Sequence, residues 1–335
     1  MSETESGLVT AGEPAAIAEA IQTEVEKVLV GNEETVEHLT IALLTRGHIL
    51  LEGVPGVAKT TIANLFAQAS GLQYRRIQMT PDILPADITG TNVYRQNIGE
   101  FELQRGPVFG NLVVADEINR ATPKTQSALL EAMQERRVTI EGTTLGLPEP
   151  FMVVATQNPI EMEGVFELPE AQRDRFQFKL TVDIPEREDE AEILDRFDSN
   201  PNLNTDTVEQ VITRESILNA QDRIADNYVA DPVKSYILDL VGATRTHPDV
   251  RHGASPRATI TFIDGAKARA ALRGRSYVIP DDVKALAPAI LAHRLVLETD
   301  AELSDVTPQA IVEDVLEETA VPDVEPSEMA TPKEA

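Results

Sequence analysis

The 335-residue sequence contains no cysteine and no tryptophan, and aromatic residues make up only 4% of it. The absence of cysteine excludes disulfide bonds, thiolate metal sites and cysteine nucleophiles. The five histidines show no ligand-like spacing, so a zinc site built from histidine alone is not expected. Because aromatics are so scarce, the core has to be aliphatic. A hydrophobic fraction of 42% is enough for one large domain or two ordinary ones.

The sequence also lacks a recognisable targeting or membrane-spanning segment. Residues 1–19 are polar and acidic, with no basic stretch followed by an apolar one, so they do not form a signal peptide. No window approaches the roughly 18 uncharged apolar residues that a membrane helix needs. We therefore expect a soluble, cytoplasmic protein with no membrane insertion.

Positive charge is scarce. The sequence has 29 basic and 56 acidic residues, a net charge of −27, and only eight of the basic residues are lysine. The acidic excess is spread along the whole chain, which resembles the proteins of salt-accumulating halophiles and predicts a halophilic, archaeal source. No broad basic face is expected, so nucleic acid is not an expected partner, although a small local basic patch is compatible with the sequence.

Short apolar runs alternate with helical patterns in the first half of the chain. This alternation predicts an α/β fold in which a parallel sheet lies between helices. The run at 74–79 is the weakest of these strands because it contains two arginines. The predicted strands are 48–52, 74–79, 112–116, 151–156 and 177–183, and the predicted helices are 15–29, 33–46, 59–70 and 124–136.

Two segments of this half are longer than ordinary connections, and long loops on such scaffolds are often functional. Residues 81–110 are irregular, whereas residues 136–149 predict a β-hairpin around Gly142. After Pro185 the pattern is helical only, which predicts a smaller all-α lid domain. The expected lid helices are 186–198, 214–226, 231–247, 256–274, 280–292 and 308–318. The predicted division is a disordered leader 1–14, a core 15–185, a lid 186–319 and an acidic disordered tail 320–335.

A phosphate-binding loop is indicated by residues 53–60, which follow an apolar run and open a helical pattern. Such a junction offers concave backbone N–H groups, a helix N-terminus and one cation, which together bind a phosphate. Lys59 is expected to reach the β- and γ-phosphates of ATP, and the Thr60 hydroxyl to bind Mg²⁺. The expected nucleotide-binding residues of this segment are Gly53, Val54, Pro55, Gly56, Val57, Ala58, Lys59, Thr60 and Thr61.

One position of this loop departs from the usual pattern, in which a glycine precedes the lysine. Ala58 stands at that position. The anion is bound mainly by backbone N–H groups, which alanine also provides, so binding is retained if φ at Ala58 is negative. The alternative interpretation of the whole segment is an ordinary strand–turn–helix junction with a solvated lysine.

Two further polar groups stand where apolar strands end. Asp116 and Glu117 close the run 112–116, and Asn158 follows the run 151–156. The carboxyl ends of parallel strands line the ligand crevice of a sheet. Asp116 is therefore expected to hold Mg²⁺, Glu117 to polarise the attacking water, and Asn158 to position that water or contact the γ-phosphate. Taken alone, each of these groups is more often part of a solvated turn, but their combination with the phosphate-binding loop favours the functional interpretation.

Phosphoryl transfer also needs positive charge on the departing phosphoryl group. Arg175 and Arg257 lie far from the loop in sequence and are candidates for this role. The alternative for each is a surface ion pair, which is common in so acidic a chain.

These motifs together resemble those of the AAA+ ATPases, and in finer detail the MoxR branch of that family. The resemblance covers about residues 15–318. The segments that carry it are 50–60 (LLEGVPGVAKT), 106–109 (GPVF), 115–121 (ADEINRA), 125–134 (TQSALLEAMQ), 155–159 (ATQNP) and 164–172 (GVFELPEAQ).

The resemblance implies a role for each candidate residue. Lys59 and Thr60 match the Walker A residues, Asp116 and Glu117 match Walker B, and Asn158 matches sensor 1. Arg257 matches sensor 2, which reaches from the lid to the nucleotide of its own subunit. Arg175 matches the arginine finger, which enters the neighbouring subunit's site, with Arg173 as a second candidate. Gly31 falls where the family lines its adenine pocket.

The resemblance further implies a hexameric ring that hydrolyses ATP with Mg²⁺. The inserts 81–110 and 136–149 match the helix-2 and pre-sensor-1 insertions, which face the ring's central pore. MoxR-type proteins are similar to chaperones that remodel or mature a partner complex, often one with a von Willebrand A domain. The alternatives are a helicase-like ring that acts on nucleic acid and a nucleotide-dependent scaffold with little turnover.

Overall fold

The computed structural model describes residues 8–97, 99–159, 164–201 and 203–323. At its centre is a parallel five-stranded sheet in the order β2-β5-β8-β1-β9. All five predicted strands and the parallel α/β fold are confirmed. The strands are β1 (Ile49–Glu52), β2 (Tyr74–Gln78), β5 (Leu112–Asp116), β8 (Met152–Gln157) and β9 (Phe178–Thr181).

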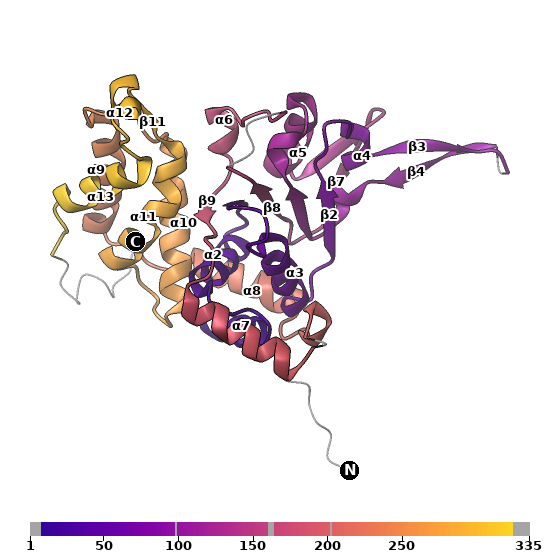
Figure 1. Ribbon diagram of the computed structural model, residues 1–335, viewed down its shortest axis with the longest axis horizontal. Coiled ribbons are helices and arrows are strands. Elements are labelled where there is room, and N and C mark those ends of the chain that lie inside the picture. Colours follow the sequence, from indigo (N-terminus) through magenta and orange to yellow (C-terminus); the bar gives the residue numbers. More distant parts are fainter. Residues whose placement is uncertain (1–7, 98, 160–163, 202, 324–335) are drawn as a thin grey trace, which may run out of the picture.

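Helices cover both faces of this sheet (Figure 1). Successive strand side chains point to opposite faces, so each strand contributes to two cores. Leu51, Val114 and Val154 pack on the side of α1 (Pro14–Val25), α2 (Glu33–Leu44) and α3 (Lys59–Ala69). Leu50 and Val153 belong to the second core, together with residues of α4 (Pro85–Thr89) and α5 (Pro123–Glu135).

His48 links the sheet to α5 from within the core. Its Nδ1 accepts a hydrogen bond from the Val153 N–H at 3.0 Å, so its Nε2 carries the proton and donates to the Met133 carbonyl at 3.2 Å. Burial lowers the pKa of His48 from 6.5 to about 4, because the charged imidazolium loses its hydration. The ring is therefore neutral in the folded protein at neutral pH.

The two inserts both form β-hairpins. The hairpin predicted within 136–149 is confirmed as β6 (Arg137–Ile140) and β7 (Thr143–Gly146). The irregular segment 81–110 contains α4, a hairpin of β3 (Gly90–Arg95) and β4 (Glu100–Arg105), and the short helix η1 (Pro107–Phe109). Both strands of this second hairpin are largely exposed on both faces, so they lack the alternating pattern that predicts strands. The β3–β4 hairpin projects from the body as an arm (Figure 1).

The second half of the chain is mainly helical, as predicted. The prediction of helices only is wrong where β10 (Val250–His252) pairs with β11 (Val296–Leu297). These strands were missed because they have three and two residues. The remaining elements are α7 (Arg187–Ser199), η3 (Thr205–Thr207), α8 (Arg214–Ala225), α9 (Asp231–Thr246), α10 (Pro256–Leu272), α11 (Pro280–Leu291), η4 (Ala292–Arg294), α12 (Thr299–Leu303) and α13 (Pro308–Glu318).

The first helices of the predicted lid, α7 and α8, lie against the α/β core (Figure 1), and α8 also packs against the lid helix α10. On α8, Gln221 donates to the Leu43 carbonyl at 2.9 Å and accepts from the Arg46 side chain at 2.9 Å. On α7, the Arg196 guanidinium donates to the Glu26 carbonyl of the turn after α1. Helices α9, α10, α11 and α13 pack together at the other end of the molecule, and α10 also packs against α1, α2 and α8.

The prediction of a disordered leader is wrong for residues 8–13. Val9 forms a parallel β-bridge with Ile212, and Glu13 forms an ion pair with Arg223. Residues 1–7 and most of the predicted tail, 324–335, lie outside the described residues. In the described part of the chain, no helix combines the length and the apolar character that spanning a membrane requires.

Candidate active site

A cavity of about 370 Å³ lies where the sheet's carboxyl ends meet the N-terminus of α3. The structure brings together here the phosphate-binding loop and the polar residues after β5 and β8. One site therefore contains the residues that match Walker A, Walker B and sensor 1. The lining residues are Pro55, Gly56, Ala58, Lys59, Thr60, Thr61, Asp116, Glu117, Thr156, Gln157 and Asn158.

The Lys59 ammonium is held over the loop at the start of α3. Its Nζ donates to the Gly53 carbonyl at 2.6 Å and to the Val54 carbonyl at 2.8 Å. Burial lowers its pKa, while the carboxylates of Asp116 and Glu117 act in the opposite direction. A cation at a helix N-terminus opposes the helix dipole, and α3 has no acidic residue in its first turn. The local charge distribution therefore favours an anion at this position.

Phosphate binding was expected to be retained if φ at Ala58 were negative, but the φ of Ala58 is positive. Its φ is +63° and its ψ is 18°, in the left-handed region. The N–H is still available to an anion, but alanine adopts this conformation at a steric penalty that glycine does not have. The loop therefore keeps its phosphate-binding groups in a strained backbone.

The residues present fit a Mg²⁺ ion. The Thr60 hydroxyl lies 3.3 and 3.4 Å from the two carboxylate oxygens of Asp116, and the Thr156 hydroxyl donates to Asp116 Oδ1 at 2.6 Å. Mg²⁺ prefers oxygen ligands and is usually held by one or two protein groups together with phosphates and water. Within the described residues, no cluster of three or more His, Cys, Asp or Glu side chains could hold a metal alone. Phosphate and water oxygens would therefore have to complete the coordination of a bound ion.

Arg76 is a site residue that the sequence analysis missed. From β2, its Nη2 contacts Asp116 Oδ2 at 2.6 Å and its Nε contacts the same oxygen at 3.1 Å. The hydrogen bond with Asp116 raises the pKa of Arg76. The signal was present in the sequence, because the two arginines in this strand were the feature that made it a weak prediction. At least one of them, Arg76, faces the carboxylate of Asp116.

The Glu117 carboxylate is held by neighbouring side chains. Its Oε2 accepts from Gln78 Nε2 at 2.8 Å and forms an ion pair with Arg120 at 3.4 Å. Its N–H donates to the Thr156 hydroxyl at 2.9 Å, and its backbone is left-handed, with φ of 58°. Strained backbone of this kind persists where surrounding contacts determine it, often in active sites. Gln78 is a second residue that was missed.

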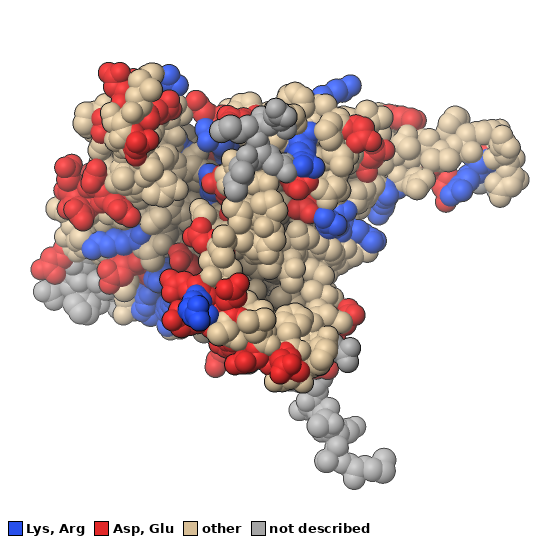
Figure 2. Space-filling view, in the orientation of Figure 1, with Lys and Arg blue, Asp and Glu red and all other residues tan. Residues whose placement is uncertain are grey.

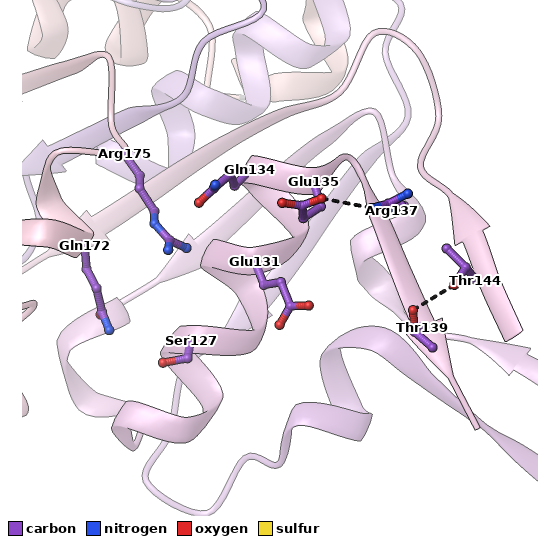
Figure 3. A pocket seen from close by; sticks show the side chains of 9 residues that line it. All are labelled: Ser127, Glu131, Gln134, Glu135, Arg137, Thr139, Thr144, Gln172 and Arg175. Carbon is purple, nitrogen blue, oxygen red and sulfur yellow. Dashed lines mark hydrogen bonds and ion pairs between the residues drawn. The ribbon is translucent and has the colours of Figure 1, made fainter. Parts of the chain in front are cut away.

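Six predicted residues do not line this cavity: Gly53, Val54 and Val57 of the loop itself, and Gly31, Arg175 and Arg257 from outside the loop. Arg175 is half-buried and lines a different cavity, of about 620 Å³, between α5, the β6–β7 hairpin and Gln172 (Figure 3). Arg257 Nη1 instead points to the Asp174 carbonyl at 3.5 Å. At Gly31 the φ is +69°, and an added Cβ would lie 2.9 Å from the Asp189 carboxylate of α7. One chain therefore brings neither Arg175 nor Arg257 to its own nucleotide cavity.

Comparison with known proteins supports the same interpretation. The family model "ATPase family associated with various cellular activities (AAA)" matches residues 48–178, and the model "AAA lid domain" matches residues 242–315. The chain is 46% identical over 310 residues to the chaperone MoxR1 of Mycobacterium tuberculosis. This alignment covers 90% of this chain and 81% of that protein. It is 32% identical over 312 residues to the protein MoxR of Methylorubrum extorquens, covering 85% of this chain and 89% of that protein.

The chain belongs to the MoxR-type AAA ATPases. A solved structure agrees with this assignment: a crystal structure of a Cytophaga hutchinsonii protein superposes with a TM-score of 0.86 at 41% identity, over 92% of this chain and 96% of that one. The AAA core is followed by a helical lid, and the protein is an ATP hydrolase. In this MoxR-type ATPase, the cavity at the carboxyl ends of β1, β5 and β8 is therefore the candidate ATP site.

Proposed function

We propose that this chain hydrolyses ATP as part of an oligomeric ring, most simply a hexamer, in which neighbouring subunits share each active site. The observation that carries the proposal is the separation of Arg175 from its own chain's nucleotide cavity. Arg175 lines a cavity open to the surface, on the side of α5 away from the sheet (Figure 3). A neighbouring subunit that docks there would receive this guanidinium beside its own ATP.

We assign the steps of hydrolysis to residues of the cavity. The loop N–H groups and Lys59 bind the phosphates, and Thr60 and Asp116 would hold Mg²⁺, which would supply positive charge to offset that of the phosphates. Glu117 accepts the proton of the attacking water as the bond between the γ-phosphorus and the ADP oxygen breaks. Asn158 orients that water without adding charge, and the neighbour's Arg175 stabilises the charge on the departing phosphoryl group. Arg257 Nη1 contacts the Asp174 carbonyl in this structure, and Arg257 would have to leave that contact to reach the phosphates of its own subunit.

The shared site is tested by mixing two inactive variants. The Glu117→Gln variant keeps the proposed arginine finger, Arg175, but lacks the general base. The Arg175→Ala variant keeps the general base, Glu117, but lacks the arginine finger. Each alone is expected to bind ATP without hydrolysing it. Mixed before assembly, they form interfaces with an intact base on one side and an intact finger on the other, so turnover returns. No recovery on mixing would contradict a shared site.

We further propose that ATP hydrolysis drives chaperone-like remodelling or maturation of a partner protein complex, with a von Willebrand A domain protein as the first candidate client. The name of the Mycobacterium tuberculosis relative, a chaperone, supports this. The arm offers a contact surface: Tyr94 and Phe101 pair across the hairpin with ring centroids 5.3 Å apart and are 53% and 70% exposed. Exposed aromatic pairs of this kind commonly anchor protein partners.

The two inserts are joined, which supports a common role. Asn92 of the arm donates to the Glu141 carboxylate at the tip of the β6–β7 hairpin at 2.8 Å. The charge of the arm is balanced, with an Arg95–Glu102 ion pair at 2.7 Å, whereas acidic side chains are spread over much of the remaining visible face (Figure 2). We also propose that this acidic surface adapts the protein to concentrated salt.

Replacing both arm aromatics, Tyr94→Ala and Phe101→Ala, tests the client contact. Basal ATP turnover is expected to be unchanged, because the arm lies outside the nucleotide cavity, while stimulation by a purified von Willebrand A domain protein is lost. Leu303→Ala is the control, since Leu303 is an apolar residue on the lid that is even more exposed, at 79%. Stimulation that survives the double substitution would refute a role for the arm.

A further inference from the structure

Asp174 lies directly before the proposed finger Arg175, and both of its carboxylate oxygens are bound by the lid. Asp174 Oδ1 accepts from Arg294 Nε at 2.8 Å, and Oδ2 accepts from the Ser255 hydroxyl at 3.0 Å. Ser255 caps the N-terminus of α10, and Arg294 ends the short helix η4 after α11. Two separate lid elements therefore meet at the residue next to the finger.

Arg294 also holds the backbone on the other side of the finger. Its Nη2 donates to the Phe176 carbonyl at 2.7 Å, its Nη1 donates to the Gln177 carbonyl at 3.3 Å, and His293 Nε2 donates to the Phe176 carbonyl at 3.2 Å. The Arg294 side chain is only 2% exposed, whereas that of Asp174 is 22% exposed. A guanidinium so deeply buried needs its anionic partner, because an unpaired buried charge is strongly destabilising. The Arg294–Asp174 ion pair therefore holds the lid to the turn 174–177, and breaking it would strongly destabilise the protein.

The finger itself is free of this network. The Arg175 side chain lies in the cavity beside α5, toward Gln134 and Glu131 (Figure 3). Arg294 binds Asp174 and Phe176, the residues on either side of Arg175. The lid therefore fixes the position of this turn, and the turn fixes the direction of the Arg175 side chain. Displacement of a catalytic group by about 1 Å is enough to lower a rate by roughly a hundredfold.

We propose that Asp174 is a positioning residue that ties the finger turn to the lid, so that each subunit's lid controls hydrolysis in the neighbouring subunit's site. This inference rests on the proposed sharing of sites between subunits. It assigns to Asp174 an effect in the neighbour's site and none on ATP binding in its own cavity, which it does not line.

The test is an asymmetric mixing experiment with Asp174→Asn, which keeps the size of the side chain but removes its charge. Alone, this variant is expected to bind ATP normally and to hydrolyse it roughly ten- to a hundredfold more slowly. Mixed with Glu117→Gln, it regains turnover, since its own intact site receives a good finger. Mixed with Arg175→Ala it does not, since neither subunit then supplies a well-placed finger.

The reverse pattern, recovery with Arg175→Ala and none with Glu117→Gln, would place the defect in the variant's own site and overturn the proposal. Ser255→Ala provides a second variant that keeps the buried ion pair, and it is expected to give the same one-sided pattern with a smaller loss. Recovery of Ser255→Ala with both partners or with neither would also contradict the inference. Asp195→Asn, at an exposed position of α7, is the matched control and should behave as wild type in every mixture.

The mixture of Glu117→Gln with Arg175→Ala, run in parallel, separates the two levels of the argument. If that mixture fails to recover, the shared site itself is wrong. If it recovers while Asp174→Asn shows the reverse pattern, the shared site stands and only the positioning role is refuted.

Discussion

Ala58→Gly is predicted to stabilise the protein, although glycine usually destabilises it. Ala58 has a φ of +63° and its side chain is exposed, so the substitution relieves backbone strain without losing buried apolar surface. Left-handed backbone costs a residue with a Cβ roughly 1–2 kcal/mol, and the greater freedom of glycine in the unfolded chain offsets about 0.4–1 kcal/mol of that relief. The net expectation is a gain of about 0.5–1 kcal/mol.

The matched control is Ala191→Gly, the same chemical change at an exposed position inside α7. There the backbone is helical, so glycine is expected to cost about 1 kcal/mol. Thermal unfolding in concentrated KCl should move the two midpoints in opposite directions, by a few degrees at most. ATP affinity should change by less than about threefold, because the loop N–H is kept. If both variants are destabilised alike, the strained loop geometry is wrong.

Three further predictions follow from individual contacts. Arg76→Gln removes the guanidinium that contacts the Asp116 carboxylate, where Mg²⁺ is proposed to bind. Half-maximal ATP turnover should then need several-fold less Mg²⁺, because a competing positive charge is gone. A higher Mg²⁺ requirement would show that Arg76 supports the metal site. The pKa of His48 is 6.5 in the unfolded chain and about 4 in the folded protein. The neutral ring therefore contributes stability on the order of 3 kcal/mol above pH 6.5, and this contribution is lost as pH falls toward 4. Denaturant unfolding of His48→Gln at pH 7, 5.5 and 4 should depend less on pH than wild type, and an equal dependence would refute the assignment. Gly90→Ala should destabilise the arm, because a Cβ there would lie 2.3 Å from a backbone carbonyl. Gly242→Ala on α9 is the control: its Cβ would meet no atom within 4 Å, so this variant should be neutral or stabilising. Limited proteolysis that finds the arm unchanged in Gly90→Ala would contradict the prediction.

The sheet and its phosphate-binding loop could be predicted because they depend on local, periodic signals. Continuous apolar runs such as 112–116 are typical of strands buried on both faces, and the loop 53–60 has fixed spacing. The arm could not be predicted in this way, since its strands have no buried face to impose alternation. The pair β10–β11 is too short to leave a pattern.

The site was predicted where chemistry follows directly from a strand end and missed where it depends on register. Asp116 and Asn158 could be placed because the carboxyl ends of parallel strands converge. Arg76 and Gln78 reach the carboxylates of Asp116 and Glu117 only because β2 pairs with β5 in a register that sets Gln78 opposite Asp116. Nor could the sequence predict that Ala58 is left-handed, since its φ depends on the loop as a whole.

The central claim, that a neighbouring subunit completes each ATP site, is tested most directly by measuring ATP turnover per subunit against protein concentration in high-potassium buffer, for wild type and Arg175→Ala. A shared site predicts that wild-type turnover rises as oligomers form, whereas Arg175→Ala binds ATP at every concentration and hydrolyses almost none. Turnover per subunit that is constant down to the monomer, and is retained by Arg175→Ala, would contradict it.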